Sequence, residues 1–174
     1  MSSTTPAPLE ATEVATPVGP LAIVTDAGTV VASGFTTVED QLGRLDPALQ
    51  ARGVVRTDDL GEVTDAVHAY FAGDVDALDR VRVRQPGGDF TQEAWRVMRT
   101  IPAGQTWSYA ELATKSGRPA AVRAAGSACA RNMVAPFVPC HRVVRTGGSL
   151  GGYYYGLPVK QWLLDHERGV TTAF

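Results

Sequence analysis

A Pro-Gly-Gly sequence at residues 86–88 divides this 174-residue chain into two parts of different texture. Proline followed by two glycines disfavours both helix and strand and is typical of a linker. The part before it is rich in short β-prone runs, and the part after it is rich in helical patterns. A chain of this length suits one ordinary domain or two small ones. We therefore predict an α/β (α+β) protein with an N-terminal domain over residues 13–86 and a C-terminal domain over residues 89–174.

Short runs of β-prone side chains separated by glycine turns predict a small antiparallel sheet in the N-terminal domain. A helical spacing of apolar residues then predicts a helix that ends at Gly73, and an alternation of apolar and charged residues predicts one further strand. The predicted strands cover residues 13–20, 21–25, 29–35 and 79–85, and the predicted helix covers 62–72. Residues 1–12 are rich in Ser, Thr, Pro and Ala, so we expect them to form a disordered tail.

The C-terminal domain has the pattern of a helix-turn-helix. A helix that begins near Tyr109 stops at Gly117, and a second helix is predicted over residues 120–131. The second helix is rich in alanine, and its only charged residues are Arg123 and Arg131. Such a slim helix suits close approach either to another helix or to a nucleic-acid groove. We predict a mostly helical, winged-helix-like domain, and the basic charge described next favours DNA as its partner.

The net charge of −2 conceals a strong asymmetry along the chain. Residues 1–89 hold 6 Lys and Arg against 14 Asp and Glu, a net charge of −8, whereas residues 90–174 hold 10 against 4, a net charge of +6. A basic half beside an acidic half indicates that the second half meets a polyanion. The alternative is that two oppositely charged domains simply attract each other.

Reactive groups are concentrated in Pro139-Cys140-His141-Arg142, which lies between apolar neighbours. A lone cysteine in such a run is commonly a small core residue. An adjacent imidazole and guanidinium, however, favour a thiolate and hence a nucleophile. We interpret Cys129 as a buried helix residue. Two cysteines and three histidines without ligand spacing predict neither a disulfide framework nor a metal site.

The chain carries no feature that predicts export or membrane insertion. No apolar run approaches the length that spans a bilayer, and no basic residue precedes an apolar core at the N-terminus. The low cysteine count fits a reducing compartment. We therefore expect a soluble, cytoplasmic protein.

The stretch Pro139-Cys140-His141-Arg142-Val143 resembles the active-site signature of the O6-alkylguanine-DNA alkyltransferases, the methylated-DNA–protein-cysteine methyltransferases. The resemblance covers nearly all of residues 13–169, and the combined pattern is very specific. Its other parts are Ile101-Pro102-x-Gly104-x-Thr106-x-Ser108-Tyr109, Gly117-x-Pro119-x-Ala121-x-Arg123-Ala124-x-Gly126, Asn132, Gly152-Tyr153, Lys160-x-x-Leu163-Leu164-x-x-Glu167, and more weakly Thr16-Pro17-Val18-Gly19-Pro20 and Tyr70-Phe71-Ala72-Gly73.

The resemblance implies direct reversal of damage in DNA. Cys140 would accept the alkyl group of O6-methylguanine after base flipping, His141 would act as base through a water, and Glu167 would orient His141. Asn132 would brace the site, and Tyr109 would assist flipping and donate a hydrogen bond to the guanine. The thioether product is stable, so each molecule would react once. No cofactor is expected, because the damaged DNA supplies the methyl group.

The same resemblance implies which residues meet the DNA. The second helix would lie in the minor groove, with Arg123 filling the space left by the flipped base. We assign Ala124, Gly126, Ser127 and Arg131 to this interface. The Val143 carbonyl would accept a hydrogen bond from the guanine amino group, and the backbone near Tyr154 would donate toward O6. The remaining residues assigned to the substrate pocket are Met133, Pro139 and Tyr153.

Several positions depart from the family pattern. Met133 stands where proline usually follows the asparagine, and Pro136 where an aliphatic residue is common. Tyr154 and Tyr155 occupy loop positions that are often small, so they either exclude large alkyl groups or point to solvent. The zinc ligands of some relatives have no counterpart here. The expected partner is double-stranded DNA that contains O6-alkylguanine, with O4-methylthymine as a further candidate substrate. We expect a monomer, and cooperative binding is left open.

Two other functional classes remain open. A non-catalytic damage-recognition protein of the alkyltransferase-like type would share this domain, but proteins of that type lack the acceptor cysteine. A helix-turn-helix regulator with a structural cysteine would bind undamaged DNA sequence-selectively. A cysteine hydrolase is a less favoured hypothesis, and such an enzyme would turn over a soluble ester.

Overall fold

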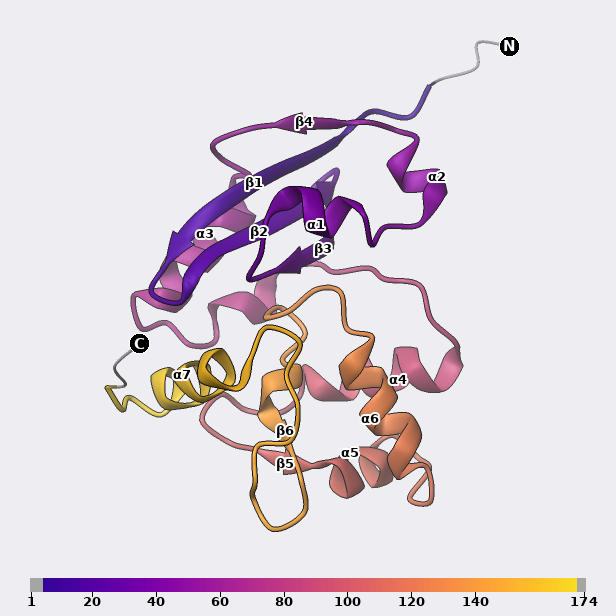
Figure 1. Cartoon of the computed structure of the whole chain (residues 1–174), viewed down its shortest axis with the longest axis vertical. Helices are drawn as coiled ribbons and strands as arrows, with labels where there is room; N and C mark the ends of the chain where they lie inside the picture. Colours follow the sequence, from indigo (N-terminus) through magenta and orange to yellow (C-terminus); the bar gives the residue numbers. More distant parts are fainter. Residues whose placement is uncertain (1–4, 172–174) are drawn as a thin grey trace.

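The computed structural model describes residues 5–171, and its first half is built on a four-stranded sheet (Figure 1). Strands β1 (Leu9–Thr16), β2 (Gly19–Asp26) and β3 (Thr29–Gly34) form an antiparallel meander, and β4 (Val54–Arg56) pairs parallel to β1 in the order β3-β2-β1-β4. The predicted antiparallel strands are thus confirmed. The tail prediction is wrong for residues 9–12, because Leu9 and Ala11 are buried in β1; residues 1–4 lie outside the described residues.

Both faces of the sheet are covered, which explains the continuous apolar run of β2. Ala22 and Val24 face a small cluster under helix α1 (Val38–Leu42), beyond which lies the short α2 (Pro47–Gln50). Leu21 and Ile23 face the opposite way, toward helix α3 (Glu62–Phe71). Alternate side chains of a strand point to opposite faces, so one apolar strand can serve two packing layers.

The predicted strand over residues 79–85 is wrong for most of its length. Residues Ala77–Arg80 form the 3₁₀ helix η1, and only Val83 makes a bridge, with Val30 on the edge of β3. Val81 and Gln85 are buried and Val83 packs against the core, whereas Arg82 and Arg84 are exposed. The alternation therefore reflects an extended segment that meets the sheet only at Val83.

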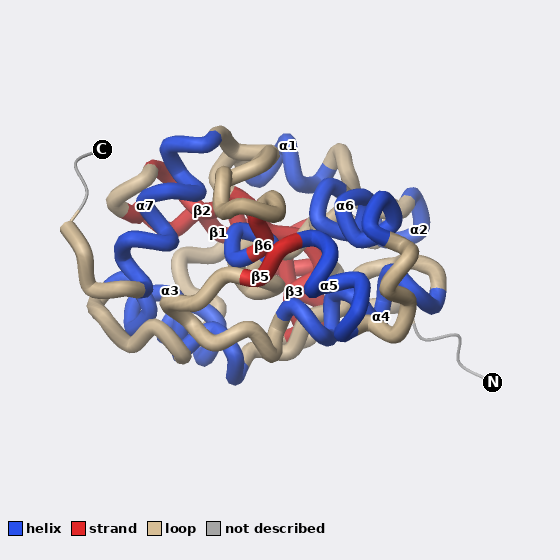
Figure 2. Tube along the Cα trace, turned by 90° about the horizontal axis from the view of Figure 1, so that it is seen from below, coloured by secondary structure: helices blue, strands red, loops and turns tan. Residues whose placement is uncertain are grey.

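The second half is mostly helical, as predicted. It contains α4 (Asp89–Met98), α5 (Tyr109–Lys115), α6 (Val122–Ala130), the 3₁₀ helix η2 (Cys140–Arg142) and α7 (Leu157–Glu167). Helices α5 and α6 form the predicted helix-turn-helix, and the Ser108 side chain caps α5 by accepting from the Glu111 N–H. A parallel pair, β5 (Trp107–Ser108) and β6 (Val143–Val144), was not predicted. Figure 2 shows this pair between α7 and the α4–α6 group.

The two halves share one hydrophobic core rather than touching only at their surfaces. Residues of β2, α3, α4, α6 and α7 belong to a single buried cluster. The Ser33 hydroxyl donates to the Ala135 carbonyl at 2.8 Å, and the Arg99 guanidinium donates to the Leu78 and Val81 carbonyls, both at 2.9 Å. The site described below depends on this continuity, because side chains from both halves reach it.

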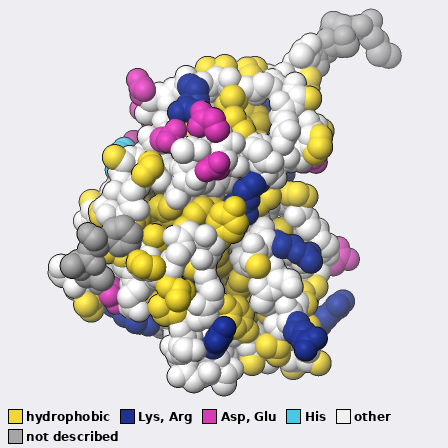
Figure 3. Space-filling view, in the orientation of Figure 1, with side chains coloured by type: hydrophobic (Ala, Val, Ile, Leu, Met, Phe, Trp, Pro, Cys, Tyr) yellow, Lys and Arg dark blue, Asp and Glu magenta, His cyan; other side chains and the backbone are white. Residues whose placement is uncertain are grey.

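The surface keeps the charge asymmetry of the sequence. On the face shown in Figure 3, acidic side chains gather over the sheet-containing half, while Lys and Arg side chains are spread over the helical half. Within residues 5–171, no helix is both long and apolar enough to cross a membrane.

Candidate active site

Cys140 lies at the base of a cavity of about 290 Å³ between α5, α6 and the loop that precedes α7. The thiol residue opens η2 directly after Pro139 and is 9% exposed. The cavity is therefore open enough to admit a group to the sulfur while its walls exclude bulk water. It is lined by Tyr109, Gly126, Cys129, Ala130, Asn132, Ala135, Cys140, Gly152, Tyr153, Tyr154 and Tyr155.

Behind Cys140, the Glu167 carboxylate gathers four donors in the core. His141 Nε2 lies 2.8 Å from Oε2, and the Arg142 guanidinium donates through Nε at 2.9 Å and Nη2 at 3.0 Å. The Tyr70 hydroxyl, from α3, donates to Oε2 at 2.7 Å. The side chain of Glu167 is fully buried. Four donors of this kind hold the carboxylate ionised and immobile.

The protonation of this network follows from its contacts. Burial alone would raise the pKa of Glu167, but His141 and Arg142 overcome that and hold it well below its usual range. An ionised carboxylate only accepts hydrogen bonds, so His141 Nε2 must carry the proton and Nδ1 must carry the lone pair. Burial lowers the pKa of His141 despite Glu167, which keeps the ring neutral at neutral pH. Nδ1 is buried and has no protein partner. The Nδ1 lone pair is thus free to accept a proton, and it belongs to the residue that follows Cys140 in the chain.

The thiol is also neutral at rest. Burial raises the pKa of Cys140, and the Asn132 amide and the Lys160 ammonium act against that rise. A buried thiol beside a neutral imidazole needs a proton acceptor at the moment of reaction, because the thiolate is the nucleophile.

Asn132 is buried between α6 and η2. Its Nδ2 donates to the Val138 carbonyl at 2.8 Å, and its Oδ1 accepts from Gln85 Nε2 at 3.0 Å and from the Val134 N–H at 3.1 Å. These bonds fix the turn that delivers Cys140 to the cavity. Gln85, at the end of the first half, is therefore a second brace that sequence reasoning missed.

Met133 does not line the cavity, so its assignment to the substrate pocket is wrong. Its side chain packs against the small cluster on the sheet. Its N–H donates to Gln85 Oε1 at 2.8 Å, a bond that proline at this position would forfeit. Methionine in place of the family's usual proline therefore adds a hydrogen bond to Gln85 at this turn.

The other assigned pocket residues divide into two layers. Tyr153 and Tyr154 line the cavity, and Tyr154 is 69% exposed at its mouth. Pro139 and Val143 lie buried and are not among the residues that line it, so their assignment to the substrate pocket stays a prediction. The Val143 carbonyl accepts from Lys160 Nζ at 2.7 Å, and its second lone pair is left for another donor.

Lys160 is a further buried residue that received no role from the sequence. It is fully buried, and its Nζ donates to the carbonyls of Val143, Leu150 and Gly152, the last at 3.1 Å. It thereby ties the loop before α7 to β6. Its signal in the sequence was its place between Val159 and Leu163 on the apolar face of the last helix.

The residues assigned to DNA lie on one outer face of α6. Arg123, Ser127 and Arg131 are exposed, whereas Ala124 and Gly126 are half-buried. Tyr109, at the start of α5, lines the cavity and lies against Gly126. Cys129 lies in helix α6 as predicted, but its side chain is half-buried and lines the same cavity. The structure thus brings the exposed face of α6 and the cavity of Cys140 next to each other.

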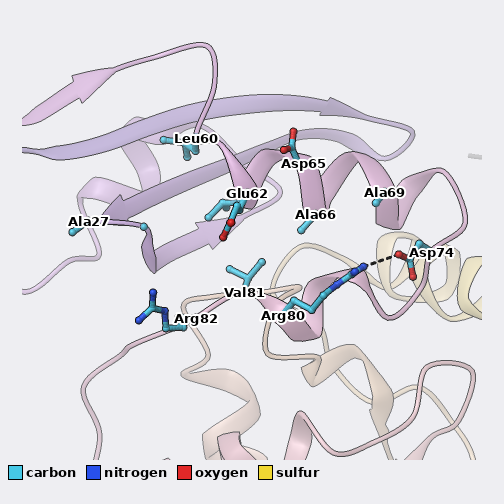
Figure 4. A pocket seen from close by; sticks show the side chains of 12 residues that line it. Ala27, Leu60, Glu62, Asp65, Ala66, Ala69, Asp74, Arg80, Val81 and Arg82 are labelled. Atoms are coloured by element: carbon cyan, nitrogen blue, oxygen red, sulfur yellow. Dashed lines mark hydrogen bonds and ion pairs between the residues drawn. The ribbon is translucent and has the colours of Figure 1, made fainter.

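A larger cavity, of about 780 Å³, lies between α3 and the segment that follows η1 (Figure 4). Its charged side chains include Arg80, which pairs with Asp74 at 2.7 Å. It contains no cysteine or histidine and none of the predicted site residues, so we place the chemistry at Cys140 despite the smaller volume there. Among residues 5–171, no three His, Cys, Asp or Glu lie close enough together to hold a metal ion.

Comparison with known proteins gives one consistent result. Residues 89–169 match the family described as 6-O-methylguanine DNA methyltransferase, DNA binding domain. A methylated-DNA–protein-cysteine methyltransferase of Shigella flexneri is 36% identical over 159 residues, which cover 89% of this chain and 93% of the relative. One of Mycobacterium bovis is 37% identical over 160 residues, 90% and 91% of the two chains. The solved structure of Mycobacterium tuberculosis OGT in complex with DNA superposes with a TM-score of 0.76 at 31% identity, covering 92% of this chain and 93% of that one.

Proposed function

This chain belongs to the methylated-DNA–protein-cysteine methyltransferases, and on that premise we propose that Cys140 is the alkyl acceptor of a single-turnover DNA-repair reaction. The substrate is O6-methylguanine in double-stranded DNA. The observation that carries the proposal is the buried series Cys140, His141, Glu167 at the base of an open cavity, in which His141 Nδ1 is free.

His141 Nδ1 is the acceptor suited to the proton of Cys140. A water between the thiol and His141 Nδ1 relays the proton to the imidazole as the sulfur attacks the methyl carbon. The bond between that carbon and O6 breaks, its electron pair passes to the guanine, and the guanine takes up a proton. The products are S-methylcysteine and unmodified guanine. Glu167 stabilises the imidazolium that forms, and no group in the site can hydrolyse a thioether, so the protein is consumed.

The target base must leave the stack before its methyl group can reach the sulfur. Unstacking costs a few kcal/mol, and the protein has to supply this through contacts. Arg123 extends from the exposed face of α6 beside the cavity, which suits it to occupy the vacated space. Tyr109 at the cavity wall is placed to donate to the flipped guanine. The expected environment is the cytoplasm, where DNA is accessible and thiols stay reduced.

Replacing Arg123 by alanine is expected to slow transfer from duplex DNA by about 10- to 100-fold, because no side chain then occupies the space that the flipped base leaves in the stack. The matched control is Arg96→Ala, which removes an exposed arginine of α4 that pairs only with Glu93. Single-turnover rates on duplex and single-stranded oligonucleotides give the measurement. Because a single strand needs little unstacking, the loss should be much smaller there; equal losses on both substrates would refute this role.

Replacing Tyr70 by phenylalanine is expected to shift the pH dependence of transfer. The change removes one donor from Glu167 Oε2, so the carboxylate interacts more strongly with His141 Nε2 and favours the imidazolium. A raised pKa of His141 means that the free base is lost at a higher pH. The acidic limb of the rate profile therefore moves to higher pH, with transfer about two- to fivefold slower near pH 6.

The other ionisable groups around His141 remain in this variant. They are Arg142 and Lys160, which lower its pKa, and the neutral Tyr153 beside the cavity. A profile from single-turnover rates between pH 5 and pH 9 is the measurement. If the acidic limb of the Tyr70→Phe rate profile stays at the pH of the unaltered protein, or moves to lower pH, the positioning role of Tyr70 is contradicted.

The proposed function is tested by incubating purified protein with a duplex oligonucleotide that holds one O6-methylguanine. Nuclease digestion and chromatography then quantify the remaining O6-methylguanine. We expect removal to stop at one methyl group per protein when the protein is limiting. Unchanged O6-methylguanine in the presence of folded protein would defeat the proposal.

A further inference from the structure

Tyr155, at the end of the loop that walls the Cys140 cavity, is inserted into the first half of the chain. Its hydroxyl accepts hydrogen bonds from Gln41 Nε2 at 3.0 Å and from Arg44 Nη1 at 3.1 Å. Its ring packs edge-on against Phe35, with centroids 5.9 Å apart. The ring therefore points into the protein and not to solvent, although it also lines the cavity.

The space for Tyr155 exists because residue 34 is glycine. A Cβ at Gly34 would lie 1.8 Å from the Tyr155 hydroxyl oxygen and 2.4 Å from Gln41 Nε2. Gln41 itself is fully buried on α1. We call Gly34, Gln41 and Arg44 the Tyr155 socket. None of the three lines the cavity, so any influence they have on it must pass through Tyr155.

The seated Tyr155 also holds the two tyrosines before it. Its ring lies 5.7 Å from that of Tyr153 and 4.9 Å from that of Tyr154, both edge-on. The Arg44 guanidinium, which bonds the Tyr155 hydroxyl, lies 4.4 Å from the centroid of the Tyr154 ring, a cation–π distance. One arginine of the first half thus contacts two rings of the cavity wall, and all three rings are held together.

We propose that the Tyr155 socket makes the wall of the alkyl pocket rigid and thereby restricts the protein to small O6-alkyl groups. The inference rests on the proposed function and names the residues that set its substrate range. The cavity, about 290 Å³, lies at the lower limit of ligand-binding cavities. The cavity has to hold the flipped guanine together with its alkyl group, so a benzyl group leaves less free space than a methyl group and depends more on the position of the Tyr153–Tyr155 wall. Movement of that wall requires breaking the bonds to Gln41 and Arg44.

The test compares transfer of methyl and benzyl groups from the same duplex, carrying either O6-methylguanine or O6-benzylguanine. Single-turnover rates give the preference for methyl over benzyl. We expect Tyr155→Gly to lower this preference by at least about tenfold. The double variant Gln41→Leu/Arg44→Leu keeps Tyr155 but removes the two hydrogen bonds that its hydroxyl accepts, leaving the 3.5 Å bond to the Ser33 carbonyl, and we expect it to lower the preference by about three- to tenfold. Tyr155→Phe, which keeps the ring and loses the hydroxyl, should resemble the double variant.

The control is Arg80→Leu, an exposed arginine of the same half that lies on η1 and pairs with Asp74; its preference should match the unaltered protein. Thermal unfolding of each variant verifies that it is folded. If Tyr155→Gly does not fold, the preference for methyl over benzyl in Tyr155→Phe tests the inference instead. Two results would overturn the inference and leave the proposed function intact. In the first, the unaltered protein transfers methyl and benzyl groups equally fast. In the second, the preference for methyl in Tyr155→Phe and in the double variant stays within about twofold of that of the unaltered protein. A folded protein that transfers neither group refutes both.

Discussion

Replacing Cys140 by alanine abolishes methyl transfer, with a loss of at least about 1000-fold, because the variant lacks the thiol that forms the bond to the methyl carbon. The same cavity offers a matched control. Cys129 also lines it, but it lies on α6 and not next to His141 in the chain, and the Asn132 amide lowers the pKa of Cys140 and not that of Cys129. The Cys129→Ala protein should therefore transfer at close to the original rate.

The measurement is the rate at which a labelled methyl group passes from duplex DNA to each variant. Binding to the same duplex, followed by fluorescence anisotropy, should be preserved in both, since neither cysteine belongs to the outer face of α6. If Cys140→Ala still takes up the label, or if Cys129→Ala loses the ability, the acceptor has been assigned to the wrong sulfur.

Replacing Glu167 by glutamine is expected to cost about 3–5 kcal/mol of unfolding free energy, because it leaves the buried Arg142 guanidinium without its counter-charge. The same change should slow transfer by about 100-fold or more, since the imidazolium loses its partner. Glu10→Gln is the control, as Glu10 is exposed on β1. Chemical denaturation and single-turnover rates measure the two effects.

The pH dependence of stability checks this prediction separately. The folded-state pKa of Glu167 lies below the ordinary value of 4.5 for a glutamate, so its stabilising contribution is present above that pH and is lost as the pH falls. The difference in unfolding free energy between the unaltered protein and Glu167→Gln should accordingly shrink below about pH 4.5. A difference that stays constant down to pH 3 would mean that the carboxylate does not interact with Arg142 and His141 as described.

The sequence predicted the parts of the fold that depend on local pattern. The helix before Gly73, the slim helix α6 and the meander of short strands all follow from spacing and turn residues. The strand predicted over residues 79–85 was wrong for most of its length, because alternation over a few residues does not distinguish a strand from an extended segment that meets the sheet only at Val83. The start of β1 at Leu9 was missed, since a Thr- and Ala-rich segment takes its strand from its partners rather than from its own propensity.

Residue chemistry alone predicted the site only where its residues are adjacent in the chain, whereas Glu167, Asn132 and Tyr109 were predicted through the family resemblance. Cys140 and His141 stand next to each other, and the thiol–imidazole pair has chemistry of its own. Tyr70 lies 97 residues from Glu167, and nothing in its local sequence indicates that its hydroxyl reaches the carboxylate. Tyr155 could be singled out as bulky, yet its direction depends on Gly34 in the opposite half. Such contacts arise from the shared core, which single-sequence patterns do not encode.

The central claim is tested most directly by intact mass and peptide mapping after incubation with a duplex that contains O6-methylguanine. The account predicts a single gain equal to one CH₂ unit, at no more than one equivalent, located on the peptide that carries Cys140. A protein that binds the lesion but keeps its original mass, or that carries the methyl group on Cys129, would contradict it.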